Sequence, residues 1–564
     1  MDNLNRRAVV SVSLGVQLHL SQLKARPAVA KSLTVLAGFI VFAALIFPNV
    51  VERLTPLGFL RVPVEGAFLI ALLLVPPKPR RVVGIVVGVL LGLVVIEKLL
   101  DMGFFSELNR PFDPVLDWVL FDDAYNFVVD SYGKGAAIGA IAAIVALVAL
   151  VLTLTTWAVL RVGALIGRNQ RRSIIAAGGI AVAWAASFAL GLSITGAVPI
   201  AARSTATYAW DRVHQAQDGL KDEARFAAEV KQDAFANVPP NQMLTALKGK
   251  DVIFTFVESY GRSAIEHPQL APMIDPVLDR LTGQLTTAGF QSRSGWLTSP
   301  TFGGGSWLAH STFESGLWIN NQQRYRNLVS SNRLTLTRAF HGEDFRTVSV
   351  MPGATSAWPE GAFYGYDQVW DSRNLGYRGP KFSWAPMPDQ YTLKQLNTIE
   401  YQKPDRKNLM IEMPLVSSHT PWAPIPTYLD DWDSIGDGSI YAPMAADGKK
   451  PKALWADPVQ VRPEYGKSIV YSVTSLVNWI TKYGDDNLVM VFLGDHQPSP
   501  IASGAGASHD VPISIVTKDK AVMERITDWQ WAAGLRPQGD TPVWPMNAFR
   551  DRFFTAFDTK AAAS

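Results

Sequence analysis

The sequence contains no cysteine among its 564 residues. This absence excludes disulfide bonds, thiolate metal sites and cysteine nucleophiles, and it leaves the redox compartment open. Charged side chains are also scarce, at 18% of the chain, and they nearly cancel to a net charge of +3. Without a basic excess there is no electrostatic reason to expect a nucleic-acid partner. Apolar residues are abundant instead, at 48%, and they are concentrated in the first part of the chain.

Five apolar runs in that part are close to the roughly 20 residues that a helix needs to cross a bilayer. The first run is too long for a removable signal peptide and lacks a small-residue cleavage site after it, so we interpret it as a signal anchor. In the third run, glycines recur every fourth residue at positions 84, 88 and 92, which predicts close packing between helices, either within this bundle or in a dimer. The five runs are Ser32–Val51, Leu57–Leu74, Val82–Leu100, Ala136–Leu160 and Ile174–Pro199.

Basic residues are distributed unevenly over the short loops between these runs. The basic segments contain Arg6, Arg7, Lys24, Arg26 and Lys31 before the first run, Lys78, Arg80 and Arg81 after the second, and Arg161, Arg168, Arg171 and Arg172 after the fourth. The alternate loops carry far fewer. Because positive loops stay in the cytoplasm, we expect a multi-pass plasma-membrane protein with a cytoplasmic N-terminus and everything after the fifth span outside.

The composition changes after Ala202, which predicts three regions: a transmembrane domain over 1–202, a linker over 203–249, and an extracytoplasmic domain over 250–564. Within the linker, Ser204–Phe235 is charged and has apolar residues at helical spacing. It predicts a helix that lies either on the membrane surface or in solvent.

In the last region, short β-rich runs alternate with longer amphipathic stretches. The runs are "DVIFTFV", "FRTVSVM", "NLMIEMPL", "LVMVFLG" and "VPISIVT", and the helical stretches lie near Leu270–Ala288, Ser306–Leu317, Leu334–His341 and Pro463–Tyr483. This alternation predicts a largely parallel sheet covered by helices on both faces. Ligands of such sheets bind beyond the carboxyl ends of the strands.

Chemically active side chains follow two of these runs directly. Glu258 comes after "DVIFTFV", and Asp495 and His496 come after "LVMVFLG". Singly, each could cap a helix or be structural. Together they bring two carboxylates and an imidazole to one sheet edge, a donor set that suits Mn²⁺, Mg²⁺ or Zn²⁺.

A third candidate is Ser306, which follows three glycines in "SPTFGGGSWLAH" and begins a predicted helix. The free N–H groups and the positive end of a helix stabilise anions. They would help to ionise the hydroxyl and to hold a phosphate, while the glycines leave room for the substrate. The alternative is that Ser306 is an ordinary N-cap.

The ordered motifs "VESYGR", "SPTFGGGSWLAH" and "GDHQP", together with the five apolar runs, resemble the membrane-anchored sulfatase-like proteins of the alkaline phosphatase superfamily. The nearest well-known type is the group of lipoteichoic acid synthases and phosphoglycerol transferases. The resemblance implies an α/β domain of the alkaline phosphatase type.

It also implies that Glu258, Ser306, Asp495 and His496 bind one divalent ion, commonly Mn²⁺ in the synthases. Ser306 would be the nucleophile in place of the usual threonine. His419, which follows "EMPLVSS", would meet the substrate.

Other positions that the resemblance singles out match less closely. Trp358 would lie near the glycerol group, but Pro359 and Glu360 follow it where the synthases have an arginine. Phosphate recognition would then pass to Arg262, Arg373 or Arg378, or the substrate differs. His509 could be a metal ligand, a proton donor to the leaving group or a surface residue, whereas we expect His310 to be a packing residue.

The expected function is a metal-dependent transfer of phosphoglycerol from phosphatidylglycerol to an envelope glycan or polymer, through a phospho-serine intermediate. A phosphoethanolamine transferase, or a phosphodiesterase or sulfatase-like hydrolase of the same superfamily, is the first alternative. The known phosphoethanolamine transferases generally contain disulfides, which this chain cannot form. A catalytically inert, membrane-anchored glycan-binding protein is an alternative of another class.

Overall fold

The computed structural model describes residues 27–194, 198–202 and 204–558. They form two compact units: the described residues of Met1–Met102 with Ile138–His214, and Gly103–Ala137 with the described residues of Gln215–Ser564. We call the first the membrane unit and the second the α/β unit. Arg6, Arg7, Lys24 and Arg26, on which part of the predicted orientation rests, lie outside the described residues.

Four helices of the described chain are long and apolar enough to cross a membrane. They are α2 (Pro27–Ile46), α4 (Pro77–Leu108), α6 (Lys134–Arg168) and α7 (Gln170–Ala189). The expected span over Leu57–Leu74 differs: its only α-helix is α3 (Glu65–Leu73), nine residues or about 13 Å long. This is shorter than the hydrocarbon core of a bilayer, which is about 30 Å thick. Four described helices, rather than the predicted five, are therefore of spanning length.

The glycine ridge of α4 packs against α6, as the spacing predicts. A Cβ added at Gly88 would lie 2.5 Å from the Cα of Thr156, and one at Gly92 would lie 2.6 Å from Oγ1 of Thr155. Any larger side chain would push the two helices apart. Residues 84–92 therefore serve helix packing within the membrane unit.

A nine-stranded sheet forms the centre of the α/β unit. Its main path runs β12 (Ala532–Ala533), β6 (Gln291–Thr298), β11 (Asp510–Thr517), β10 (Leu488–Gly494), β5 (Asp251–Val257), β9 (Leu409–Leu415), β7 (Arg346–Met351), β8 (Gln368–Asp371), and β13 (Val543–Pro545) pairs with β6. The five strands from β10 to β8 are parallel, whereas β11 is antiparallel to both β10 and β6. The sheet is therefore mixed, with a parallel centre.

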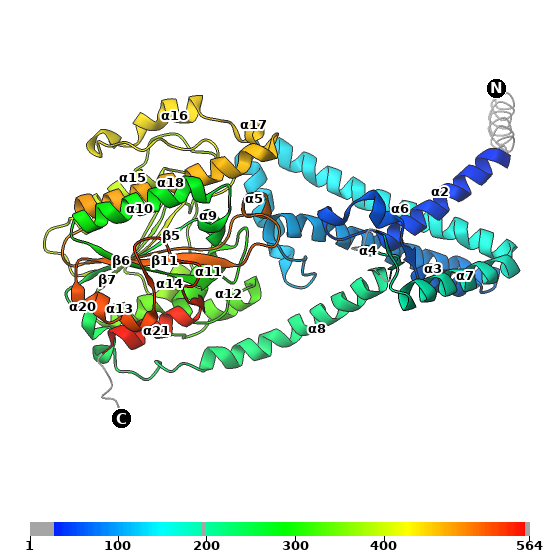
Figure 1. The fold of residues 1–564 in the computed structure, drawn as a ribbon, viewed down its shortest axis with the longest axis horizontal. Coiled ribbons are helices and arrows are strands. Elements are labelled where there is room, and N and C mark those ends of the chain that lie inside the picture. The colour runs from blue at the N-terminus through cyan, green and yellow to red at the C-terminus, as the bar shows by residue number, and fades with distance from the viewer. Residues whose placement is uncertain (1–26, 195–197, 203, 559–564) are drawn as a thin grey trace, which may run out of the picture. The chain divides into compact units, whose positions relative to one another are not determined.

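Helices cover both faces of this sheet, which explains why its central strands are apolar throughout (Figure 1). All seven residues of β5 are buried, and alternate side chains enter different cores. Ile253 packs in the core that includes α10 (Ala271–Thr287) and α18 (Pro458–Tyr483). Phe254 faces the opposite core, which includes α11 (Ser306–Ser315) and α21 (Ala548–Phe557). The period of two in strand side chains thus divides one apolar run between two layers.

The predicted linker helix is present as α8 (Ser204–Lys231). Neither expected environment describes its second half, which belongs to the α/β unit. Phe226 is fully buried there, and Asp222 pairs with Arg324 at 2.5 Å.

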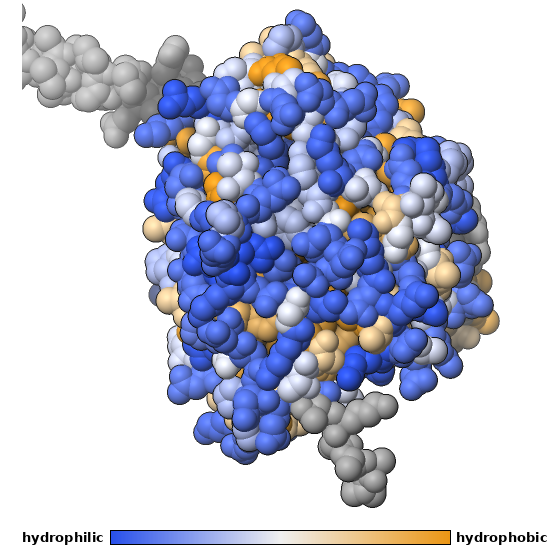
Figure 2. All heavy atoms as spheres, turned by 90° about the vertical axis from the view of Figure 1, so that its left-hand side faces the viewer, coloured by the Kyte–Doolittle hydropathy of each residue, from blue (hydrophilic) through white to orange (hydrophobic). Residues whose placement is uncertain are grey.

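One face of the α/β unit is covered mainly by hydrophilic side chains, with apolar ones in small separate patches (Figure 2).

Candidate active site

Two neighbouring parallel strands deliver the predicted metal ligands. Val257 at the end of β5 is paired with Gly494 at the end of β10. The residues that follow, Glu258 on one side and Asp495 and His496 on the other, therefore leave the sheet at the same edge. All three side chains are buried, and each offers a ligand atom within 4.8 Å of the others.

Ser306 reaches this cluster from the first turn of α11. Its Oγ lies 3.0 Å from Oε2 of Glu258 and 3.2 Å from Nε2 of His496. The N-cap of α11 is Gly305, which has a φ of +81° and makes no side-chain cap bond. Ser306 is thus the first helical residue rather than a cap, and its hydroxyl points into the cluster.

Backbone conformation explains two of the three glycines in the loop of residues 303–305, which we call the glycine loop. Gly303 has a φ of +71° and Gly305 one of +81°, a region that L-residues with a Cβ rarely adopt. The loop is also tied down, because the N–H of Gly303 donates to the carbonyl of Gln497 at 2.9 Å. We expected the glycines to give the substrate room, but the turn itself requires them at 303 and 305.

The charges of the cluster are strongly interdependent. Burial opposes ionisation of Glu258, yet the hydrogen bond and charge of His496, with the charge of His419, hold its pKa below its usual range. Burial and the charge of Glu258 raise the pKa of Asp495 to about 6. Burial would lower the pKa of His496, but the two carboxylates raise it to about 9. Two buried carboxylates thus demand a positive charge beside them.

The donor set fits a divalent cation that would supply this charge. Oδ2 of Asp495 is buried and has no hydrogen-bond partner among the described residues. His496 sits with Nδ1 2.8 Å from the carbonyl of Gln497, which fixes a tautomer with Nε2 free to bind metal. Glu258, Asp495, His496 and Ser306 would hold the ion. Hard oxygens with one imidazole suit Mn²⁺, Mg²⁺ and Zn²⁺ alike.

His419 lies at the same edge because β9 is the next strand after β5. Oγ of Ser418 donates to the carbonyl of Glu258 at 2.6 Å, which fastens the loop of His419 to the cluster. The imidazole stacks on Trp384 with ring centroids 3.8 Å apart. Burial lowers its pKa, although the charge of Glu258 acts in the opposite direction. His419 is therefore neutral at pH 7 and able to accept a proton.

His509 reaches the edge from the opposite direction. Because β11 is antiparallel to β10, the residue before its first position lies near the end of β10. The carbonyl of His509 accepts the N–H of Ser299 at 2.9 Å, and its ring lies 5.2 Å from Phe302, which directly precedes the glycine loop. Burial lowers its pKa.

The other candidate substrate residues are not brought to the cluster by any contact described for them. Arg262 pairs with Glu266 at 2.7 Å and Asp510 at 3.1 Å, and the half-exposed Arg373 pairs with Asp371 at 2.6 Å. Trp358 lies in an aromatic group, 5.4 Å from Tyr364 and 6.2 Å from Tyr366. The roles assigned to these residues, and to Arg378, stay predictions.

His310 is one helical turn beyond Ser306, and its ring packs on Phe256 with centroids 3.8 Å apart. Its Nδ1 also lies 3.2 Å from Glu412, a buried carboxylate of β9 that accepts a hydrogen bond from Tyr366. Nothing in the sequence marks this buried polar group, because its members are far apart along the chain.

Three further residues support the site and were not identified from the sequence. Ser259 has a φ of +58° and donates its N–H to Asp495 at 2.7 Å. Ser418 holds the loop of His419, as described. Asp389 accepts the N–H groups of Val416 and Ser417 at 2.7 and 2.9 Å. Adjacency to the motif residues is a usable signal for the two serines, whereas nothing in the sequence marks Asp389.

No family model and no curated protein matches the chain. Solved structures of the alkaline phosphatase superfamily are similar to it at low identity. The lipoteichoic acid synthase LtaP from Listeria monocytogenes is 16% identical, with 52% of this chain and 70% of that chain covered and a TM-score of 0.33. The phosphoglycerol transferase GacH from Streptococcus pyogenes, solved with sn-glycerol-1-phosphate, is 12% identical, with coverage of 60% and 82% and a TM-score of 0.35.

The C-terminal periplasmic domain of EptC from Escherichia coli is 13% identical, with coverage of 51% and 75% and a TM-score of 0.33. These matches are of the kind that the sequence motifs resemble. Their scores describe a partial likeness, so the chemistry of this chain rests on its own residues.

Proposed function

We propose that the protein is a membrane-bound, metal-dependent phosphotransferase that moves a phosphoglycerol group from phosphatidylglycerol to a hydroxyl of an envelope glycan or polymer. The observation that carries the proposal is the position of the Ser306 hydroxyl. It lies within hydrogen-bond distance of both Glu258 and His496, at the N-terminus of a helix. A nucleophile, an anion-stabilising helix end and a cation site thus coincide.

In the first step, Oγ of Ser306 forms a bond to the phosphorus of the lipid, and the bond from phosphorus to the diacylglycerol oxygen breaks. The proton of the hydroxyl passes to His419 or His509, whose imidazoles burial keeps neutral, and the imidazolium gives it to the leaving oxygen to form diacylglycerol. A bound divalent ion supplies positive charge for the phosphoryl group, which is the main requirement of this chemistry. Free N–H groups of the first turn of α11 add to that stabilisation.

In the second step, the oxygen of an acceptor hydroxyl forms a bond to phosphorus, the bond from phosphorus to Oγ of Ser306 breaks, and the proton of the acceptor ends on Ser306. His419 or His509 accepts the proton of the acceptor, because burial keeps both imidazoles neutral. Water as the acceptor would make the protein a phosphodiesterase.

The donor is proposed to be a membrane lipid because the described part of the same chain contains four helices of spanning length and character. Such an anchor keeps an enzyme beside a substrate that cannot leave the bilayer. We propose a plasma-membrane location with the N-terminus in the cytoplasm and the α/β unit outside, where envelope acceptors are available.

The test uses purified full-length protein in detergent with Mn²⁺ and a phospholipid labelled in its acyl chain. Release of labelled diacylglycerol from phosphatidylglycerol, absent in Ser306→Ala, is the expected result. Release from phosphatidylethanolamine alone would replace the donor with the alternative head group. Release that persists in Ser306→Ala would remove the proposed nucleophile.

A further inference from the structure

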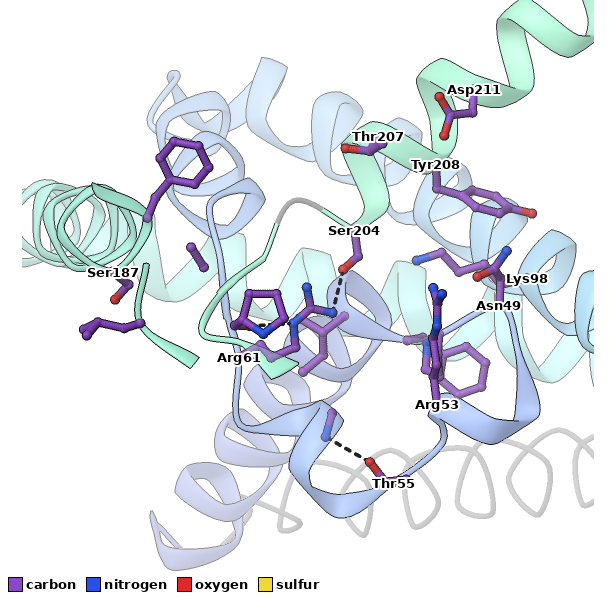
Figure 3. Close-up of a pocket in the computed structure, with 18 of the residues that line it drawn as sticks. Asn49, Arg53, Thr55, Arg61, Lys98, Ser187, Ser204, Thr207, Tyr208 and Asp211 are labelled. Atoms are coloured by element: carbon purple, nitrogen blue, oxygen red, sulfur yellow. Dashed lines mark hydrogen bonds between the residues drawn. The ribbon is translucent and has the colours of Figure 1, made fainter. Parts of the chain in front are cut away.

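The membrane unit contains a cavity of about 990 Å³ that is lined entirely by its own residues (Figure 3). It lies where α2 and α7 end and α8 begins. Its volume is at the upper end of the roughly 300–1,000 Å³ typical of small-molecule sites. Nothing in the transferase chemistry uses this cavity.

Positive side chains predominate on its polar side. Arg53, Arg61 and Lys98 line it, against a single lining carboxylate, Asp211. Lys98 is buried and donates to Oγ1 of Thr205 at 3.0 Å, and the carboxylate of Glu65 accepts the N–H of the same threonine at 3.1 Å. The charge of Lys98 is therefore partly balanced within the protein.

Neither arginine has an ion-pair partner among the side chains that the structure describes. Nε of Arg61 donates to the carbonyl of Pro199 at 3.1 Å, and its Nη1 donates to Oγ of Ser204 at 3.3 Å, which orients the guanidinium without neutralising it. Arg53 is exposed and has no ion-pair or hydrogen-bond partner among the side chains that the structure describes. Burial and the charge of Arg53 lower the pKa of Arg61, although the charge of Glu65 acts in the opposite direction.

The other side of the cavity is apolar and open. Ile46, Phe47, Phe188 and Leu192 line it, and the last two are 60% and 44% exposed. Exposed apolar side chains at the end of a spanning helix contact lipid when the protein is in a bilayer. The cavity thus joins a pair of cations to a surface that acyl chains cover.

We propose that this cavity is a binding site for an anionic phospholipid, with Arg53 and Arg61 holding the phosphate and the apolar side receiving the first part of the acyl chains. Guanidinium groups suit phosphate because they donate several charge-assisted hydrogen bonds in a fixed plane. The inference rests on the membrane unit alone, and it is independent of the chemistry of Ser306.

The test measures lipid binding by full-length Ser306→Ala protein in detergent, using native mass spectrometry and a titration with phosphatidylglycerol. Arg53→Gln and Arg61→Gln are each expected to weaken binding at this site about tenfold, the usual loss for a charge-assisted hydrogen bond. The double variant Arg171→Gln and Arg172→Gln is the control, because it removes two exposed positive charges outside the cavity.

Arg53→Gln removes no side-chain hydrogen bond or ion pair within the described protein, so a loss of binding there is not explained by misfolding. Equal affinity in Arg53→Gln and the control would overturn the inference. Arginine-dependent binding of inorganic phosphate, without binding of the lipid, would overturn the assignment to a lipid. Binding of a lipid at the Ser306 site is distinguished because it should be lost in Glu258→Gln. Failure of the proposed function and failure of this inference therefore affect binding in different variants.

Discussion

Replacing Asp389 with asparagine tests how the loop of His419 is held. Asp389 is fully buried, and its carboxylate accepts the N–H groups of Val416 and Ser417 and the hydroxyl of Ser472, the last at 2.6 Å. Burial is the largest influence on this group and raises its pKa to about 6, although the three hydrogen bonds oppose it. An asparagine can keep all three bonds, since Oδ1 accepts and Nδ2 can donate to the serine.

The sign of the pH effect follows from the raised pKa. Asp389 titrates at 3.8 in the unfolded chain and at about 6 in the folded protein. As pH rises between these values, the unfolded chain loses its proton first, so this group lowers the free energy of unfolding. A difference of about 2 pKa units corresponds to about 3 kcal/mol, reached above pH 6 and absent below pH 4. In a unit of this size the equivalent change in thermal midpoint is about 4 °C.

The assay compares the thermal unfolding of Asp389→Asn and wild-type protein in detergent with EDTA from pH 4 to pH 8. We expect the variant to gain stability relative to wild type as pH rises. Taking the difference between the two proteins cancels the titration of Asp495, which is present in both. A difference that does not change with pH would refute the assignment of the raised pKa to Asp389.

Three more predictions concern the candidate active site. Gly305→Ala should lower the free energy of unfolding by about 1–2 kcal/mol and reduce kcat, because an alanine there must adopt a φ of +81°. Gly304→Ala is the control, because φ is not positive at that residue. Equal effects of the two substitutions would contradict the argument. Glu258→Gln should weaken metal binding by more than the about 10–100-fold that results from replacing residues that contact the ligands of a metal. Analysis of the metal content of the purified proteins checks this. A wild-type protein that binds no divalent ion would favour the inert glycan-binding alternative. Burial lowers the pKa of His419, so kcat/KM should fall with decreasing pH below 6.5 as the ring becomes protonated. If the pH profile of kcat/KM is the same in His419→Gln as in wild type, His419 is excluded as the proton acceptor.

The central strands could be predicted from the sequence to within a residue. The run "DVIFTFV" coincides with β5 and "LVMVFLG" with β10, because strands buried on both faces are apolar at every position. β6 was missed, since Gln291–Thr298 contains Arg293 and Gly295 and is a strand by virtue of its pairing with β11, β12 and β13. The antiparallel direction of β11 also depends on this non-local pairing, which no local pattern encodes.

The core of the candidate site was predictable for the same reason. Strand ends in a parallel sheet meet at one edge, so Glu258 and Asp495 can be placed together from the sequence alone. The residues that hold the site in place could not be found in this way. Asp389 acts on the loop of His419 from a helix, and Glu412 acts on His310 from a neighbouring strand, so their roles arise only from tertiary contacts.

The position of Ser306 separates a catalytic role from a structural one more clearly than its sequence context does. The hydroxyl of a serine at the N-cap would accept a hydrogen bond from a backbone N–H of the first turn. Here the cap position is occupied by Gly305, whose left-handed conformation starts α11 without a side chain, and Ser306 is moved one residue into the helix. Its hydroxyl is then free to contact Glu258 and His496, while the N–H groups of the first turn remain available to an anion. The glycine before the serine is therefore as much a part of the proposed chemistry as the hydroxyl itself.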